Sequence, residues 1–89
     1  KMLKDKIIAL ISEKINIHHI KIDDLTEKHK NHITYENGGH YKLIIISNDF
    51  TNLSLINRHR LIYKILNGLI KKEIHALSLK TLTRDEYNK

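Results

Sequence analysis

The sequence predicts an α+β fold of two layers, in the order α-β-β-α-β-α, with a three-stranded mixed sheet. Two observations carry this prediction. Apolar residues recur at helical spacing in two stretches, and three other stretches show the alternation or the β-branched run that is typical of strands. Helices on one face of a short sheet are the arrangement that such an order favours. The length of 89 residues predicts one domain over residues 1–89.

The first half of the chain predicts one helix and two strands. Residues 2–15 carry an apolar face at helical spacing, made of Leu3, Ile7, Ile8, Ile11 and Ile15. In "HIKIDD", residues 19–24, isoleucines alternate with charged residues, as in a half-buried strand. Residues 25–40 are mostly polar and predict a long hairpin-like connection. The apolar run at 41–47, "YKLIIIS", favours a central strand that is covered on both faces.

The second half predicts a helix, a strand and a short final helix. Residues 48–57 are expected to form a connection with at most one helical turn. From 59 to 71 the pattern is helical again, with an apolar face made of Leu61, Ile62, Ile65, Leu66 and Leu69. Residues 75–83 alternate between two faces, and Thr83 with Glu86 forms a capping box for the last helix. The first two strands can pair as a hairpin, whereas the third should run parallel to the second because a helix connects them.

Composition narrows the classes of function. Sixteen Lys and Arg residues against ten Asp and Glu residues give a formal charge of +6, which favours phosphate-bearing or acidic partners. The absence of cysteine rules out disulfides and a thiolate nucleophile, so any soft metal centre would need sulfur from a partner. Neither a P-loop nor a dinucleotide fingerprint occurs, so we do not expect an enzyme. No apolar run approaches the roughly 18 residues of a membrane span and no signal peptide is recognisable, so we expect a soluble, cytoplasmic protein without a membrane partner.

Three segments carry a resemblance to a known family. They are "GGHYKLIIISNDF" at 38–50, "RHRLIYKIL" at 58–66 and "IHALSLKTLTRDEY" at 74–87. In their order and spacing the chain resembles the BolA family, over nearly its whole length. The resemblance implies the class II KH-like fold, in agreement with the element order above.

Two positions depart from the usual pattern of that family. Phe50 is followed by Thr51, Asn52 and Leu53, without the glycine that is usual there. Arg84 stands where the family usually has proline at the start of the last helix. Proline at a first helical position is favourable but dispensable, and Thr83 can still cap the helix.

The resemblance implies an adapter in iron–sulfur cluster assembly or trafficking. BolA-like proteins form heterodimers with monothiol glutaredoxins that bridge a [2Fe–2S] cluster, for which the glutaredoxin and glutathione supply the thiolates. The implied ligands of this chain are His75, which opens the last strand, and His40, in the loop before the central strand. Asn37 and His32 are alternative donors for the second position. The isolated chain is not expected to hold the cluster stably, and the free protein could form a weak homodimer.

The triplet Arg58-His59-Arg60 opens the second helical pattern. Arg58 and Arg60 are expected to flank the cluster-facing surface and to attract an acidic partner or the carboxylates of glutathione. His59 lies at the edge of the apolar face, near Tyr63 and Leu66. A packed histidine bonded to the backbone is the favoured interpretation there, although His59 could also shape the partner surface.

The family's association with DNA gives an alternative function, a DNA-binding transcriptional regulator of stress response and cell morphology. Arg60, Lys64 and Lys71 fall on the helix face opposite the apolar one, where they are either a solvated face or a contact for phosphates. The GxxG signature of KH domains is not found between the helices, so weak, salt-sensitive DNA binding is favoured over specific RNA binding.

The other histidines are expected to be solvated or packed rather than to form a metal site of their own. His29 and His32 are three residues apart, but two further ligands at zinc-finger spacing are missing. His18 and His19 adjoin a strand and would point to opposite sides of it.

Overall fold

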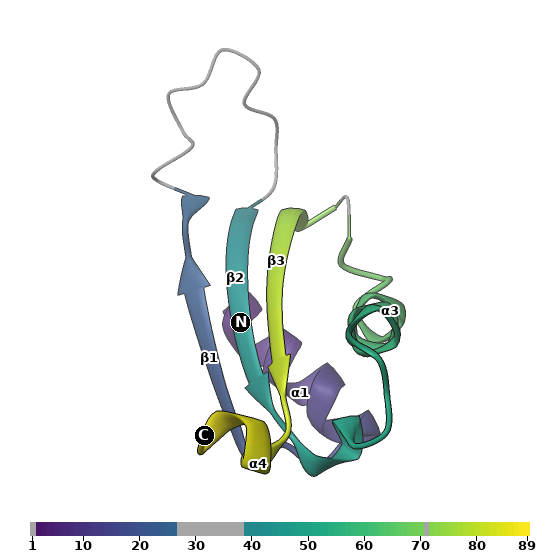
Figure 1. Ribbon diagram of the computed structural model, residues 1–89. Coiled ribbons are helices and arrows are strands. Elements are labelled where there is room, and N and C mark those ends of the chain that lie inside the picture. Colours follow the sequence, from purple (N-terminus) through teal and green to yellow (C-terminus); the bar gives the residue numbers. More distant parts are fainter. Residues whose placement is uncertain (1, 27–38, 71) are drawn as a thin grey trace.

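The computed structural model describes residues 2–26, 39–70 and 72–89. Its elements follow the predicted order, with one short 3-10 turn added (Figure 1). They are α1 (Leu3–Lys14), β1 (His19–Asp24), β2 (Gly39–Ile46), η1 (Asn48–Phe50), α3 (Leu55–Ile65), β3 (Ile74–Leu82) and α4 (Arg84–Tyr87). The predicted α+β class is therefore confirmed. No helix in this described part of the chain is long and apolar enough to cross a membrane.

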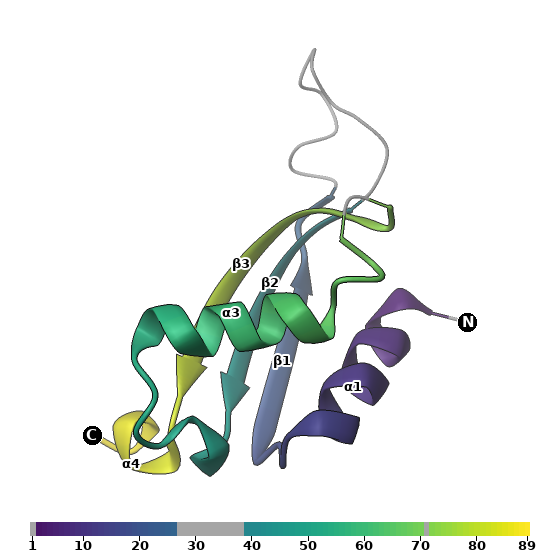
Figure 2. The same ribbon diagram turned by 90° about the vertical axis from the view of Figure 1, so that its right-hand side faces the viewer.

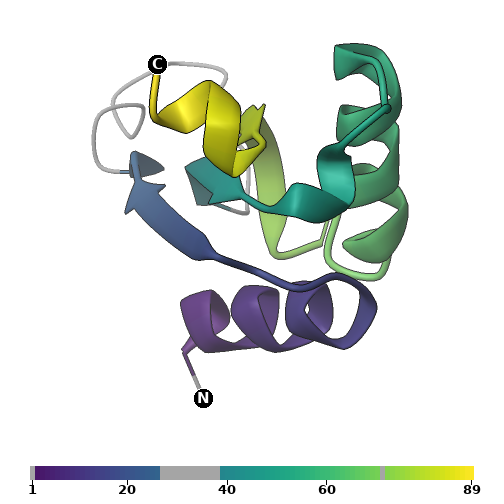
Figure 3. The same cartoon turned by 60° about the horizontal axis from the view of Figure 1, so that its bottom comes forward.

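The sheet has the predicted mixed topology. Its strand order is β1-β2-β3, with β1 antiparallel and β3 parallel to the central strand β2. Helix α1 lies across one face of the sheet, whereas α3 lies beside the outer edge of β3 and crosses the direction of that strand at a steep angle (Figures 1 and 2). The short helix α4 lies at the lower end of the opposite face (Figure 3). The expected packing of the helices on one face therefore holds for α1, whereas α3 also covers the edge at β3 and α4, on the opposite face, departs from the expectation.

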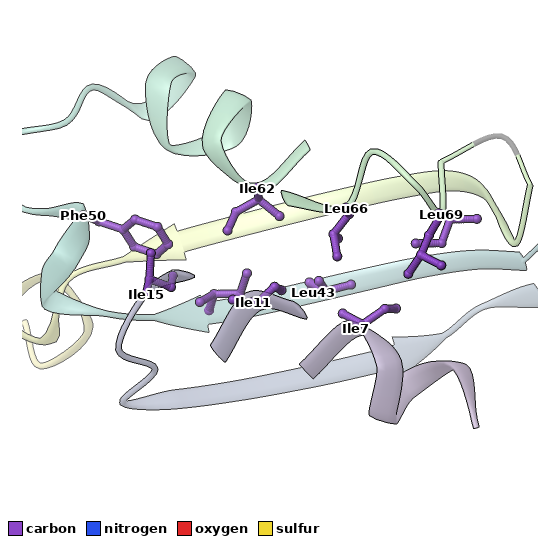
Figure 4. Close-up of a cluster of buried hydrophobic side chains, with 10 residues drawn as sticks. Ile7, Ile11, Ile15, Leu43, Phe50, Ile62, Leu66 and Leu69 are labelled. Atoms are coloured by element: carbon purple, nitrogen blue, oxygen red, sulfur yellow. The ribbon is translucent and has the colours of Figure 1, made fainter. Parts of the chain in front are cut away.

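The hydrophobic core lies between α1, α3 and one face of the sheet (Figure 4). The apolar faces predicted from helical spacing supply most of it. Its buried members are Ile7, Ile11, Ile15, Leu43, Ile45, Phe50, Ile62, Leu66, Leu69 and Ile74. Each of these residues exposes 8% or less of its surface, which confirms the predicted amphipathic pattern at these positions. Ile8, which was also predicted on the apolar face of the first helix, is instead 37% exposed.

The helix predicted at 59–71 begins earlier and ends earlier than its apolar pattern indicated. Helix α3 starts at Leu55 because the side chain of Ser54 accepts a hydrogen bond from the Asn57 N–H and caps the first turn. It ends at Ile65, and turns then carry Leu66 and Leu69 into the core. The helical spacing of apolar residues therefore continues beyond Ile65, where the helix itself ends.

The connection at 48–57 is more ordered than expected. It contains η1, which is capped by the side chain of Ser47, and the first turn of α3. Phe50 in η1 is fully buried. Asn52 has a φ of 68°, in the left-handed region that asparagine tolerates better than most residues. This connection is therefore ordered although it contains no glycine.

Strand β2 is central, as predicted, but it is not covered on both faces along its whole length. Leu43 and Ile45 are buried on the core side. On the other side Lys42 is exposed and Ile44 is half-buried, while Ile46 at the lower end is buried. We call this second side, which carries Lys21, Lys42, Ile44 and Lys80, the open face.

Candidate functional site

The structure brings His40 and His75 together at the upper end of the sheet, although 34 residues separate them in the chain. Gly39 pairs with Ile74 but His40 pairs with Ala76, so the register shifts by one residue and His75 lies in the resulting irregularity. The two imidazole rings have centroids 5.1 Å apart, with their planes tilted by 49°. Two potential nitrogen ligands therefore come from the starts of two neighbouring strands.

Backbone hydrogen bonds hold this end of the sheet in place. The Gly39 N–H donates to the Glu73 carbonyl at 2.9 Å, which ties the start of β2 to the start of β3. The His40 N–H donates to the Thr26 hydroxyl at 3.1 Å, and the His40 carbonyl accepts from the Leu25 N–H at 2.7 Å. His40 thus lies in β2 rather than in the loop before it, which corrects the expectation. Its backbone is fixed on both sides.

Gly39 is needed at this position for a packing reason that the sequence did not reveal. Tyr41 lies two residues further along β2, on the same side of the strand. A Cβ atom built on Gly39 would overlap with the Tyr41 ring. Tyr41 belongs to the margin of the core. The glycine therefore allows the Tyr41 ring to pack over the start of β2, at the margin of the core.

A shallow hollow of about 190 Å³ lies beside His40. Its lining is formed by Leu25, His40, Tyr41, Ala76, Leu77 and Ser78. The register places the side chains of His40 and Ala76 next to each other on the open face, with Ser78 two residues further down β3. The hollow therefore has a floor of small side chains and a wall that includes an imidazole.

Arg58 does not lie on a partner surface, which corrects the expectation from sequence. Its side chain is only 7% exposed, and both terminal nitrogens donate to the Glu86 carboxylate, at 2.6 and 3.1 Å. Its remaining bonds go to two backbone carbonyls, those of Leu53 at 2.9 Å and Thr81 at 3.1 Å. The fork of the guanidinium matches the carboxylate, and this donor set ties α3 to β3 and α4.

The bond to Arg58 also sets the acidity of Glu86. Hydrogen bonding from the Arg58 side chain is the main cause that lowers the pKa of Glu86 from 4.5 to about 2. The Thr83 backbone N–H is the second cause, through the capping box that was predicted and is confirmed. No local pattern indicated that Glu86 also binds Arg58, since the two residues are 28 positions apart.

The other predicted residues are distributed around α3. His59 is half-buried, as expected for a histidine at the edge of the apolar face, whereas Arg60 and Lys64 are exposed. A second hollow of about 360 Å³ lies between the helices and is lined by Lys14, Leu61, Lys64 and Ile65. Lys71, together with the loop donors and histidines at 27–38, lies outside the described residues.

No three metal-ligating side chains gather among residues 2–26, 39–70 and 72–89. The pair formed by His40 and His75 is the candidate that this part of the chain offers, and it supplies two nitrogen donors. His75 is exposed and His40 is half-buried, so the pair opens towards the surface.

Comparison with known proteins agrees with the fold. A model of the BolA-like protein family matches residues 11–86. The chain is 42% identical to an uncharacterised protein of Buchnera aphidicola, over 97% of this chain and 81% of the relative. It is 34% identical to the DNA-binding transcriptional regulator BolA of Haemophilus influenzae, over 86% of this chain and 73% of the regulator.

A solved structure gives the same result. The BolA domain of SufE1 from Arabidopsis thaliana superimposes with a TM-score of 0.79 at 30% identity, and the match covers 92% of each chain. The family match spans most of the chain and includes both histidines of the pair. This chain therefore belongs to the BolA-like protein family.

Proposed function

We propose that this chain is an adapter in iron–sulfur cluster assembly or trafficking, which holds a [2Fe–2S] cluster as cargo together with a monothiol glutaredoxin. The observation that supports this most directly is the pair of imidazoles with ring centroids 5.1 Å apart at the upper end of the sheet. Membership of the BolA-like family agrees with the proposal.

The donor set fits a shared cluster. Imidazole nitrogens are established ligands for iron in [2Fe–2S] centres and raise the reduction potential relative to thiolates. The chain has no cysteine, so the thiolate ligands come from the partner and from glutathione. His75 is exposed and is the principal ligand, and His40, held by its backbone bonds, is the second. Ligation of this kind depends on pH because the coordinating nitrogen must be deprotonated.

The test is to mix the purified chain with cluster-loaded monothiol glutaredoxin and glutathione, and to record visible absorption and circular dichroism. Formation of a one-to-one complex with a changed spectrum is the expected result. His75→Ala should abolish the change and His40→Ala should weaken it. His18→Ala is the matched control, since His18 is an exposed histidine outside the pair. An unaltered spectrum with the His75 variant would contradict the proposal.

A second candidate function is regulation of transcription through DNA binding. It is favoured by the formal charge of +6 and by the name of the Haemophilus influenzae relative, a DNA-binding transcriptional regulator. Binding through phosphates makes affinity fall steeply as salt rises, because counterions are released. The exposed Arg60 and Lys64 on α3 are the contacts that sequence alone favours. Affinity that does not change with salt would count against this function.

A further inference from the structure

We propose that the open face of the sheet binds single-stranded nucleic acid, with phosphates on Lys21, Lys42 and Lys80 and a base in the hollow beside His40. The proposal rests on the second proposed function, that the chain binds nucleic acid. The binding surface is then the open face rather than the α3 residues that sequence alone favoured, and the nucleic acid is single-stranded.

Three lysines from three different strands meet on this face. Lys21 on β1 pairs with Ile44 on β2, and Ile44 pairs with Lys80 on β3, so the three residues form one row across the sheet. Neighbouring strands lie about 4.8 Å apart, so the backbones of Lys21 and Lys80 are about 10 Å from each other. Lys42 lies two residues along β2, on the same side of the sheet. All three lysines are exposed.

Acidic groups on the open face offset only part of this charge. Asp23 pairs with Lys42 across β1 and β2, and it is half-buried. At the lower end, α4 contributes the exposed Arg84 and Asp85, which are of opposite sign, and Glu86, whose charge is paired with that of Arg58. Among the described residues the row of lysines therefore remains positively charged, and its charge complements a phosphate backbone.

The hollow adds a contact that suits a base rather than a simple anion. Its volume of about 190 Å³ and its small floor residues leave room for a flat group beside the imidazole of His40. Unpaired bases commonly stack on such rings. Ser78 lines the hollow and is also the register neighbour of Lys42. A nucleotide with its base in the hollow would therefore have its phosphate next to a lysine.

The shape of this face favours single strands over a duplex. Direct reading of a duplex normally requires a helix or a two-stranded ribbon that enters the major groove. The open face is the surface of a sheet, and its one helix in the described chain, α4, has four residues. Bases can reach a flat surface only when they are unpaired.

The test measures fluorescence anisotropy of a labelled single strand of about 12 nucleotides, from about 50 to 300 mM KCl. The triple variant Lys21→Gln, Lys42→Gln, Lys80→Gln should lower the affinity at least about tenfold at low salt. It should reduce the slope of log K against log salt by about 2, since each single-strand phosphate contact contributes about 0.7. The triple variant Lys4→Gln, Lys14→Gln, Lys72→Gln removes the same charge from exposed sites elsewhere and should keep the slope of the native chain.

A variant that leaves the charge unchanged distinguishes the contribution of the base to binding from that of the phosphates. Ala76→Leu fills the hollow without changing charge, so it should weaken binding and leave the salt slope unchanged. Thermal melts of each variant confirm that the fold is intact. An unchanged affinity with Ala76→Leu would overturn the placement of the base.

Three further results would overturn the proposed surface, the single-stranded form of the ligand, or nucleic-acid binding as a whole. If Arg60→Gln with Lys64→Gln lowers the slope and the open-face triple variant does not, the surface is wrong and nucleic-acid binding still stands. If the same sequence binds more tightly as a duplex, the single-strand assignment is wrong. If the native chain binds no nucleic acid at about 50 mM salt, this proposal and the second proposed function fail together, while the cluster proposal is untouched.

Discussion

The two ends of the sheet use polar side chains in opposite ways. At the lower end, the Ser47 hydroxyl donates to the Asn16 carbonyl at 2.6 Å, and the Arg58 guanidinium is bonded to Glu86 and to two carbonyls. At the upper end, backbone hydrogen bonds hold the starts of β2 and β3, and the imidazole of His75 lies at the surface. The same two strands, β2 and β3, form both ends.

This difference shows that the type of a residue does not tell whether its side chain stabilises the fold or contacts a partner. Arg58 and Arg60 are two positions apart in the same basic triplet, yet one is buried with internal partners and the other is exposed. A polar group whose hydrogen bonds are made within the fold contributes to stability, whereas an outward group is available to another molecule. Substitutions at the two ends should therefore separate stability from binding.

The largest expected effect is that of Arg58→Ala at the lower end. The substitution leaves the Thr81 and Leu53 carbonyls without their donor and removes the partner of Glu86. Orphaned buried polar groups cost about 1–3 kcal/mol, so we expect the free energy of unfolding to fall by about 2–3 kcal/mol. Urea unfolding measures it. His75→Ala is the comparison at the upper end and should change stability by less than about 0.5 kcal/mol; equal losses would remove the distinction.

A smaller effect of opposite sign is expected at Thr81. This residue is 1% exposed, and its hydroxyl oxygen has no hydrogen-bond partner in the described structure. Thr81→Val replaces the hydroxyl by a methyl group of similar size, so it should stabilise the fold by about 1 kcal/mol and raise the melting temperature by about 4–8 °C.

Thr83→Val is the matched control for this prediction. The Thr83 hydroxyl accepts the Glu86 N–H at 3.1 Å, as the cap of α4. Its loss should destabilise the fold by about 1 kcal/mol. The prediction fails if the two threonine variants shift the melting temperature in the same direction.

The smallest effect is a pH dependence that comes from Glu86. Its folded-state pKa is about 2, below the ordinary 4.5, so the carboxylate stabilises the fold above pH 4.5 and loses this contribution as the pH falls towards 2. Glu86→Gln should therefore differ most from the native chain above pH 4.5, and the difference should shrink towards pH 2. Chemical unfolding between pH 6 and pH 2 measures it, and a difference that stays constant would contradict the pKa.

Local patterns were enough to predict the order of elements, the parallel pairing of β3 and the capping box at Thr83. They failed at the start of α3, because Leu55 and Ile56 are exposed and so do not belong to the apolar face that the pattern follows. Ser54, the residue that caps this helix, was the signal that could have corrected the boundary.

The site was harder to predict because it depends on long-range pairing. The proximity of His40 and His75 results from the parallel pairing of the starts of β2 and β3, which no periodicity contains. The internal role of Arg58 depends on Glu86, far away in the sequence. The lysines of the open face come from three separate strands and become neighbours only when the sheet forms.

The position of α3 has a consequence for aggregation. Growth of a continuous intermolecular sheet requires two free strand edges on each molecule. Along β3, Tyr63 and Arg58 of α3 bind the outward carbonyls of Leu77 and Thr81, at 3.0 and 3.1 Å. The edge at β1 has no helix beside it (Figure 1). Pairing through β1 alone closes after two chains as a symmetric dimer, so the covered edge protects the folded protein from assembling into fibres.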